Sequence, residues 1–214
     1  MYVKNRMTTN PYTIAFDAPI TEVIELMREK NLKRVPVVHG DRVVGMLTHG
    51  DIQKVSPTKA TTLSIYELNY LLAKTKVSDA MSKDVITISP DALLEEAAVL
   101  MRDNKISTLA VVEKSKLVGI ITESDIFDSF IDLLGFRDSG SRITVQAKDV
   151  PGVLADIAEI FSDLDSNITH VGIYRGSGGY SDVVIRTNAI NTDEIEKRLT
   201  EHGYRIENVI RNED

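Results

Sequence analysis

The chain has 214 residues, 43% of them hydrophobic and 27% charged, which is typical of one or two globular domains rather than a disordered segment. Its 32 acidic and 25 basic residues give a formal net charge of −7, which argues against a nucleic-acid partner. Cysteine is absent, which excludes disulfides, thiolate metal sites and cysteine nucleophiles. The start lacks the apolar run of a signal peptide and no stretch is long enough to span a bilayer, so we expect a cytoplasmic protein without a membrane partner.

An internal repeat organises the first two thirds of the chain. Residues 3–53 align with residues 77–127 at a constant offset of 74 without a gap, and 17 of the 51 positions are identical. A gapless match of this length is hard to obtain by chance. The sequence therefore predicts a duplicated structural unit.

Both copies carry the same signals for helices and strands. An amphipathic helix is expected after an aspartate N-cap, at Asp17 and again at Asp91. Two short apolar runs around a polar turn then predict a pair of strands, at 35–38 and 43–47 in the first copy and at 109–112 and 117–121 in the second. A second helix is expected to open at Thr48 and at Thr122. Each copy is thus predicted to fold as βαββα.

The segment between the copies, residues 54–76, is too long for a simple turn. Ser64 and Glu67 have capping-box spacing, which predicts the start of a helix. One face of that helix is apolar, and it either packs on the two-copy domain or forms a dimer contact or lid. The residues of this face are Ile65, Leu68, Leu71 and Leu72.

The remainder of the chain follows a polar linker at 137–141. Residues 142–214 are expected to form strands at 142–147, 168–174, 180–187 and 205–210, with helices at 152–164 and 192–202. This βαββαβ order is that of a ferredoxin-like domain. The fold class is therefore predicted to be α/β (α+β), with a first domain at 1–136 and a second at 142–214.

A Gly-apolar-apolar-Thr-x-x-Asp motif ends the strand pair of both copies, at 45–51 and 119–125. The glycine allows a ligand close to the backbone, and a threonine at a helix start presents its hydroxyl and free N–H groups to an anion. The aspartate can accept two ribose hydroxyls. These features predict a nucleotide cradle. Thr-x-x-Asp is also a capping box that needs no ligand, and the two roles can coexist.

The repeat shape, these motif endings and the Val35-Pro36-Val37-Val38 run resemble CBS domains, and two in tandem resemble a Bateman module. The first copy corresponds to 3–53, a helical linker to 54–76 and the second copy to 77–130. In that family the threonine contacts phosphate and the aspartate holds ribose. The resemblance therefore implies nucleotide sites at Thr48 with Asp51 and at Thr122 with Asp125.

The family often places basic residues just before the proline, where they meet phosphate. Lys33 and Arg34 occupy these places in the first copy, although a solvated surface pair is an alternative interpretation. The second copy has Ser107 and Thr108 instead. Its site is expected to bind a less charged ligand, such as an adenosyl group, or to stay empty.

The strand-to-helix turn at 149–154 reads Asp-Val-Pro-Gly-Val-Leu and resembles the equivalent turn of ACT domains, over residues 142–211. The resemblance implies an amino-acid site in which a helix N-terminus meets a carboxylate. A simple turn without ligand is the alternative. The implied site residues are Asp149, Gly152, Val153, Leu154 and Asn167.

Two CBS copies followed by one ACT copy resemble the acetoin-utilisation-type regulatory proteins. The resemblance implies a non-catalytic, homodimeric sensor without a cofactor or metal, acting on an unidentified regulated protein. Its ligand would be AMP, ATP, S-adenosylmethionine or cyclic di-AMP, with an amino acid in the second domain. The alternatives are an interaction scaffold without a small-molecule ligand, and an enzyme that uses Asp51 and Asp125 as an acid–base pair.

Overall fold

The computed structural model describes residues 1–55 and 65–212, without the side chains of Ile65, Leu68, Asn69 and Asn212. The predicted capping box at Ser64 and two members of the predicted apolar face, Ile65 and Leu68, lie outside this description. The chain divides into two compact units, Met1–Phe127 and Asp128–Asp214. No helix in the described ranges has the length and apolar character of a membrane span.

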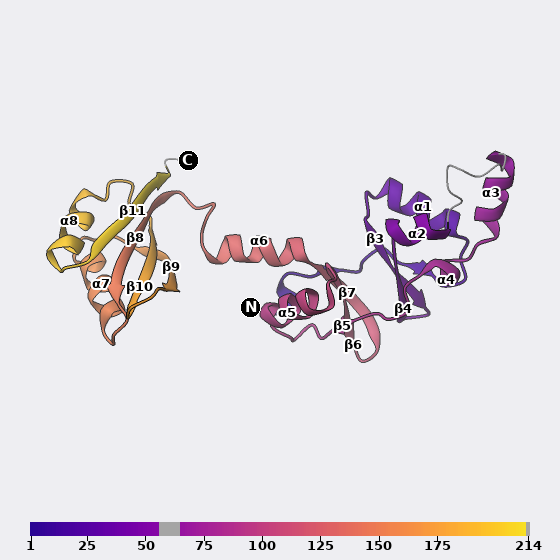
Figure 1. Cartoon of the computed structure of the whole chain (residues 1–214), viewed down its shortest axis with the longest axis horizontal. Coiled ribbons are helices and arrows are strands. Elements are labelled where there is room, and N and C mark those ends of the chain that lie inside the picture. The colour runs from indigo at the N-terminus through magenta and orange to yellow at the C-terminus, as the bar shows by residue number, and fades with distance from the viewer. Residues whose placement is uncertain (56–64, 213–214) are drawn as a thin grey trace. The chain divides into compact units, whose positions relative to one another are not determined.

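The first unit contains both copies of the repeat, and each folds as the predicted βαββα (Figure 1). In each copy a short strand pairs in parallel with the first strand of an antiparallel pair. The first copy contains β2 (Ile14–Ala15), α1 (Ile20–Glu29), β3 (Arg34–His39), β4 (Arg42–Thr48) and α2 (His49–Val55). The second contains β5 (Thr87–Ile88), α5 (Leu94–Asn104), β6 (Thr108–Glu113), β7 (Lys116–Thr122) and α6 (Glu123–Leu133). Further elements are a 3₁₀ turn η1 (Val3–Asn5), β1 (Thr8–Thr9), α3 (Ile65–Lys74) and α4 (Val77–Ala80).

The first segments of the two copies are exchanged between them. Residues 1–9, which we call arm one, fold onto the second copy, where β1 pairs with β7. Residues 75–83, arm two, fold onto the first copy, where Ser82 bridges to Met46 of β4. Val3 and Val77 lie 74 positions apart, are both fully buried, and each belongs to the hydrophobic core of the copy that its arm covers. The duplication therefore closes into one body by reciprocal contacts.

These arms explain why the predicted aspartate N-caps were wrong. The helices begin three residues later than Asp17 and Asp91, at Ile20 and Leu94. Their first N–H groups donate to backbone carbonyls of the arms, Ile20 to Thr75 (2.9 Å) and Leu94 to Met1 (3.0 Å). A backbone carbonyl of an arm thus accepts the hydrogen bond that a capping side chain would otherwise accept.

The second unit is the predicted ferredoxin-like domain. Its four-stranded antiparallel sheet has the order β11-β8-β10-β9. Both helices lie on one face of the sheet, where alternate residues of β8 and β10 form the core with α7 and α8 (Figure 1). The elements are β8 (Gly140–Lys148), α7 (Val153–Asp163), β9 (Ile168–Arg175), β10 (Tyr180–Thr187), α8 (Asp193–Glu201) and β11 (Arg205–Asn212).

A carboxylate on α7 ties that helix to the chain that follows α8. The Tyr204 hydroxyl donates to Asp156 Oδ2 (2.5 Å), and His202 Nδ1 lies 3.1 Å from Asp156 Oδ1. The Tyr204 hydrogen bond lowers the pKa of Asp156 below its ordinary 3.8, with His202 adding to the effect against partial desolvation. Burial first, and then Asp156, raises the pKa of Tyr204 from 10.0 to about 12.

Tyr204→Phe is therefore expected to lower the melting temperature by an amount that depends on pH. The Asp156 contribution is present above pH 3.8, the ordinary pKa, and is lost as pH falls through the lower folded value. The Tyr204 contribution is present below pH 10.0 and is lost as pH rises toward about 12. The difference between wild type and variant should be constant from about pH 5 to 9 and shrink outside that window. A difference that did not change with pH would contradict this account.

Candidate functional site

The two Thr-x-x-Asp motifs form the capping box at the starts of α2 and α6. The Thr48 N–H and hydroxyl donate to Asp51 Oδ2 at 3.1 and 2.6 Å, and the Thr122 N–H and hydroxyl donate to Asp125 Oδ2 at 2.8 and 2.7 Å. Burial alone would raise the pKa of Asp51, but hydrogen bonds from Thr48 and Lys54 outweigh it and hold the pKa below its ordinary value. The Asp51 carboxylate is thus ionised, and its oxygens already accept hydrogen bonds from within the chain.

A cavity of about 260 Å³ lies between the two copies, next to Thr48. Both copies line it, and its volume is close to the lower end of small-molecule sites, roughly 300–1,000 Å³. Arg34 crosses from the first copy to the second, where it donates to the Thr108 hydroxyl (2.7 Å). The lining residues are Arg34, Met46, Thr48, Ser82, Asp84, Val85, Ile86, Lys105, Ile106, Ser107 and Thr108.

The structure divides the residues predicted for the first nucleotide site. Arg34 and Thr48 line the cavity together. Asp51 stands behind Thr48 and is only 6% exposed. Lys33 is exposed and lies outside the described lining of this cavity.

The second copy contributes to the same cavity. Ser107 and Thr108, which were expected at a separate, less charged site, face Arg34 and Thr48 across it. Thr122 and Asp125 occupy the equivalent positions at the start of α6, outside this described lining. The cavity therefore combines Arg34 of one copy with Ser107 and Thr108, the uncharged counterparts of Lys33 and Arg34, of the other.

Sequence reasoning missed two charged residues of the lining, Asp84 and Lys105. Lys105 ends α5 in the left-handed conformation, with φ 53°, as its counterpart Asn31 does after α1, with φ 51°. The shared offset of 74 places both residues at the same corner of their copies. The alignment of the copies shows that Lys105 corresponds to Asn31. It does not show that Lys105 of the second copy lines the same cavity as Thr48 of the first.

The two motif glycines do not open the strands to a ligand. A Cβ at Gly45 would overlap the side chain of Met81 in arm two, and a Cβ at Gly119 would lie 2.8 Å from Met7 Sδ and 2.9 Å from the Thr8 carbonyl oxygen of arm one. The interpretation that these glycines admit a ligand was therefore wrong. They admit the exchanged arms.

A second cavity, of about 310 Å³, lies under the β8–α7 turn. Gly152 adopts φ 98° as the N-cap of α7, a conformation that favours glycine. The floor of the cavity includes Ser181 of β10, whose hydroxyl is buried and forms no hydrogen bond with any described atom. A buried hydroxyl without a partner indicates an unfilled polar site, so Ser181 is a candidate that the sequence did not reveal. Four predicted residues also line this cavity: Asp149, Gly152, Val153 and Leu154.

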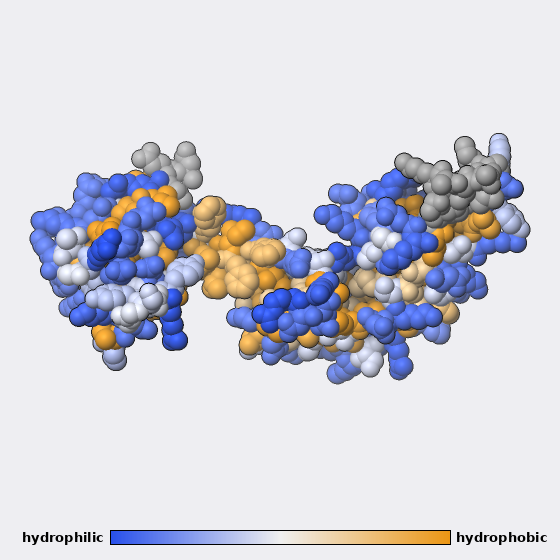
Figure 2. Space-filling view, in the orientation of Figure 1, coloured by the Kyte–Doolittle hydropathy of each residue, from blue (hydrophilic) through white to orange (hydrophobic). Residues whose placement is uncertain are grey.

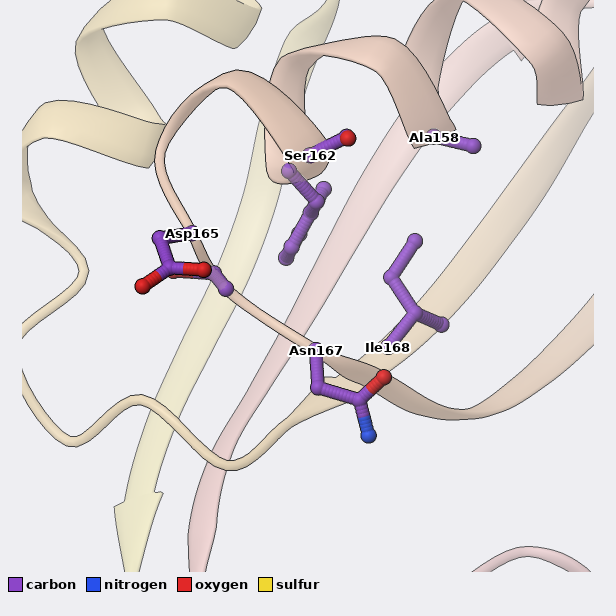
Figure 3. A pocket seen from close by; sticks show the side chains of 7 residues that line it. Ala158, Ser162, Asp165, Asn167 and Ile168 are labelled. Carbon is purple, nitrogen blue, oxygen red and sulfur yellow. The ribbon is translucent and has the colours of Figure 1, made fainter.

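Asn167, the fifth predicted residue of this site, lies elsewhere. It lines an open depression of about 400 Å³ between the end of α7 and the start of β9, with Ala158, Ser162, Asp165 and Ile168 around it (Figure 3). Its own N–H donates to Asn188 Oδ1 (3.1 Å). Within one copy of the domain, Asn167 and the β8–α7 turn therefore line different cavities.

Sequence relatives share the paired-repeat part of this architecture. The "CBS domain-containing protein YhcV" of Bacillus subtilis is 30% identical over 142 residues, which are 66% of this chain and 92% of that protein. An inosine-5'-monophosphate dehydrogenase of Thermoplasma acidophilum is 32% identical over 70% of this chain but only 28% of its own length. The chain therefore spans nearly all of one relative and about a quarter of the other.

Solved structures agree with the sequence relatives. A candidate acetoin utilization protein (AcuB) from Vibrio cholerae is 30% identical with a TM-score of 0.53, over 64% of this chain and 95% of that one. CBSX2 in complex with AMP is 25% identical with a TM-score of 0.51, over 61% and 96% of the two chains. The CBS domain pair of MJ0100, in complex with 5'-methylthioadenosine and S-adenosyl-L-methionine, is 26% identical with a TM-score of 0.50, over 64% and 98%.

The family matches fall on the two units just described. The CBS domain family matches residues 3–57 and 77–132, and the ACT domain family matches residues 141–203. The first match covers both copies of the repeat, and the second covers the ferredoxin-like unit from β8 to the end of α8. The chain belongs to the CBS-domain proteins, with two CBS domains followed by a C-terminal ACT domain.

Proposed function

We propose that this chain is a regulatory sensor of the acetoin-utilisation type, which binds an adenine nucleotide or an adenosyl compound in the cavity between its CBS domains. The observation that carries the proposal is the lining of that cavity by Arg34 and Thr48 of one copy and Lys105 of the other. A ligand held by both copies stabilises one arrangement of them over others. It can act as a signal only to the extent of that difference in affinity.

The charges of the cavity favour a ligand with few phosphates. Arg34 and Lys105 supply two positive charges and Asp84 one negative charge. AMP places a single phosphate near the two cations, and S-adenosylmethionine places an ammonium or sulfonium group within reach of Asp84. ATP brings more negative charge than these two cations neutralise. We therefore expect AMP and S-adenosylmethionine to bind more tightly than ATP. Supporting this choice, CBSX2 was solved in complex with AMP, and the CBS pair of MJ0100 in complex with adenosyl compounds.

An amino acid is the proposed ligand of the ACT unit. The N-terminus of α7 offers free N–H groups to a carboxylate, and the unpartnered Ser181 hydroxyl offers a hydrogen bond in the same cavity. We further propose a homodimer, as the resemblance implies, and a regulated protein that responds to the liganded form. Within one subunit, Asn167 and the β8–α7 turn line different cavities. Asn167 therefore joins the same amino-acid site only if a partner subunit supplies it.

Calorimetric titration of the full chain tests the nucleotide site. AMP, S-adenosylmethionine, ATP and cyclic di-AMP are titrated separately, with adenosine as the phosphate-free control. We expect saturable binding of AMP or S-adenosylmethionine, and no turnover of ATP or AMP. If no adenine compound binds, the proposal is wrong and an interaction scaffold becomes the better account. If ATP or AMP is hydrolysed and Asp51→Ala abolishes the turnover, the chain is an enzyme.

A further inference from the structure

Two arginines and a histidine form a row across the ACT sheet, on the face opposite α7 and α8. Arg186 of β10 pairs with Arg142 of β8 on one side and with His170 of β9 on the other. Directly paired residues of antiparallel strands point to the same face. The neighbours of Arg142 and Arg186 along each strand, Ile143 and Ile185, point to the other face and belong to the helix-side core. Two guanidinium groups therefore lie next to each other on one sheet surface.

Arg186 is a largely buried residue whose guanidinium lacks a direct partner. The residue is only 6% exposed, and its side chain forms no hydrogen bond and no ion pair with any residue in the described ranges. The Phe136 ring lies over it, with the ring centroid 5.7 Å from the guanidinium carbon. A guanidinium has five donors. Its nitrogens are not among the fully buried atoms that lack a partner, so they stay open to solvent and to an anion that arrives from solvent.

The groups around Arg186 sharpen this expectation. Arg142 donates to the Thr144 hydroxyl (3.0 Å) and has no carboxylate partner in the described part of the chain. The nearest acidic group, Asp138, has its Oδ2 3.5 Å from His170 Nδ1. Burial first, and then Arg142, lowers the pKa of Arg186 against a smaller opposing effect of Asp138. Asp138 thus offsets only part of the positive charge of the two guanidinium groups.

We propose that Arg142 and Arg186 together bind a small oxyanion, a phosphate or a carboxylate group, on the sheet face opposite the helices. A guanidinium fork matches the oxygens of either group, and the two arginines are directly paired on neighbouring strands. This site is separate from the cavity under the β8–α7 turn, because Arg142 and Arg186 point away from the helix side on which Ser181 lies. It also does not depend on the nucleotide proposed for the CBS pair.

The position of the site links it to the segment that enters the ACT unit. The end of α6 and the residues after it expose apolar side chains, visible as orange surface over α6 in Figure 2: Phe130, Leu133, Leu134 and Phe136. Leu134 lies over Gly172 of β9, and Gly135 is so close to the His170 ring that a Cβ there would overlap it. An oxyanion at Arg186 shares the guanidinium with Phe136. Its binding therefore alters the contact that this segment makes with the sheet.

Thermal melting of the full chain in oxyanion-free buffer tests the proposal. Inorganic phosphate and malonate are added separately, with sodium chloride at matched ionic strength as the control. For at least one of the two we expect a rise of about 4 °C at ten times the dissociation constant, which continues with the logarithm of the anion concentration above it. A response to phosphate alone identifies a phosphoryl ligand, and a response to malonate alone identifies a carboxylate. No rise with either anion overturns the proposal.

Variants locate the response. Arg142→Gln and Arg186→Met should each abolish it, and Arg186→Met should melt at or above the wild-type temperature without anion, because it removes a largely buried charge that lacks a direct partner. Arg175→Gln, at an exposed arginine of β9, is the matched control and should respond as wild type does. Arg34→Gln removes any contribution of the CBS cavity to the phosphate response, so the response that remains in this variant belongs to the ACT sheet. If Arg186→Met does not fold, Arg142→Gln alone decides. An unchanged response in Arg142→Gln, or self-association of the wild type that Arg186→Met abolishes, overturns the proposal.

Discussion

Gly119→Ala is expected to destabilise the CBS unit by about 1–3 kcal/mol, the usual cost of overpacking. The added Cβ would lie 2.9 Å from the Thr8 carbonyl oxygen, a backbone atom that is held by the pairing of β1 with β7. The strand pair cannot open at this point without losing the contact that arm one makes with the second copy. Calorimetric melting of the full chain measures the effect, and the CBS unit should melt earlier while the ACT unit is unchanged.

Gly45→Ala is the matched control, because it sits at the same position of the other copy. The three atoms nearest to its added Cβ all belong to the Met81 side chain, whose Sδ and Cγ can rotate away. We expect a smaller loss of stability, and Met81→Ala should relieve most of it in the double variant. Met7→Ala should relieve Gly119→Ala only in part, because the Thr8 carbonyl oxygen remains. Equal losses for the two alanine variants would contradict the asymmetry.

The contrast between these glycines shows what the alignment of the two copies was able to predict. The βαββα order and the strand pairs follow from local apolar periodicity and turn residues, and the structure confirms them. The helices predicted to open at Thr48 and Thr122 begin one residue later, at His49 and Glu123. The exchange of the arms leaves no local signal. Its evidence is a set of hydrogen bonds between residues far apart in the sequence, such as Ile20 to Thr75 and Leu94 to Met1. Local reasoning therefore assigned the caps to aspartates and the glycines to a ligand.

The candidate sites divide along the same line. Thr48 was predicted from its place at a helix start and Arg34 from the resemblance to CBS domains, and both line the cavity. Lys105 and Asp84 reach the same cavity only through the packing of one copy on the other. In the ACT unit the turn at 149–154 was recognisable, whereas the unpartnered Ser181 hydroxyl depends on what the fold places around it. The sequence does not show which side chains of one copy lie against which side chains of the other.

Arg34→Gln is expected to weaken AMP binding about 10- to 100-fold, the range for losing a hydrogen bond to a charged group. Arg34 is the half-buried cation of the CBS cavity, and its guanidinium is already oriented there by the Thr108 hydroxyl at 2.7 Å. A side chain held in place before the ligand arrives loses little conformational freedom on binding, so most of its interaction with phosphate appears as affinity. Calorimetric titration with AMP and with adenosine measures the change.

The comparison with adenosine separates a phosphate contact from a general loss of structure. Arg34→Gln should leave adenosine binding within about twofold of wild type, since the substitution removes charge and not the apolar lining. Lys33→Gln is the matched control, because this neighbouring cation is exposed and lies outside the described lining, so AMP affinity should hardly change. Equal loss of AMP and adenosine binding would place Arg34 in the framework of the cavity. A larger effect of Lys33→Gln than of Arg34→Gln would mean that the phosphate binds near Lys33, outside this cavity.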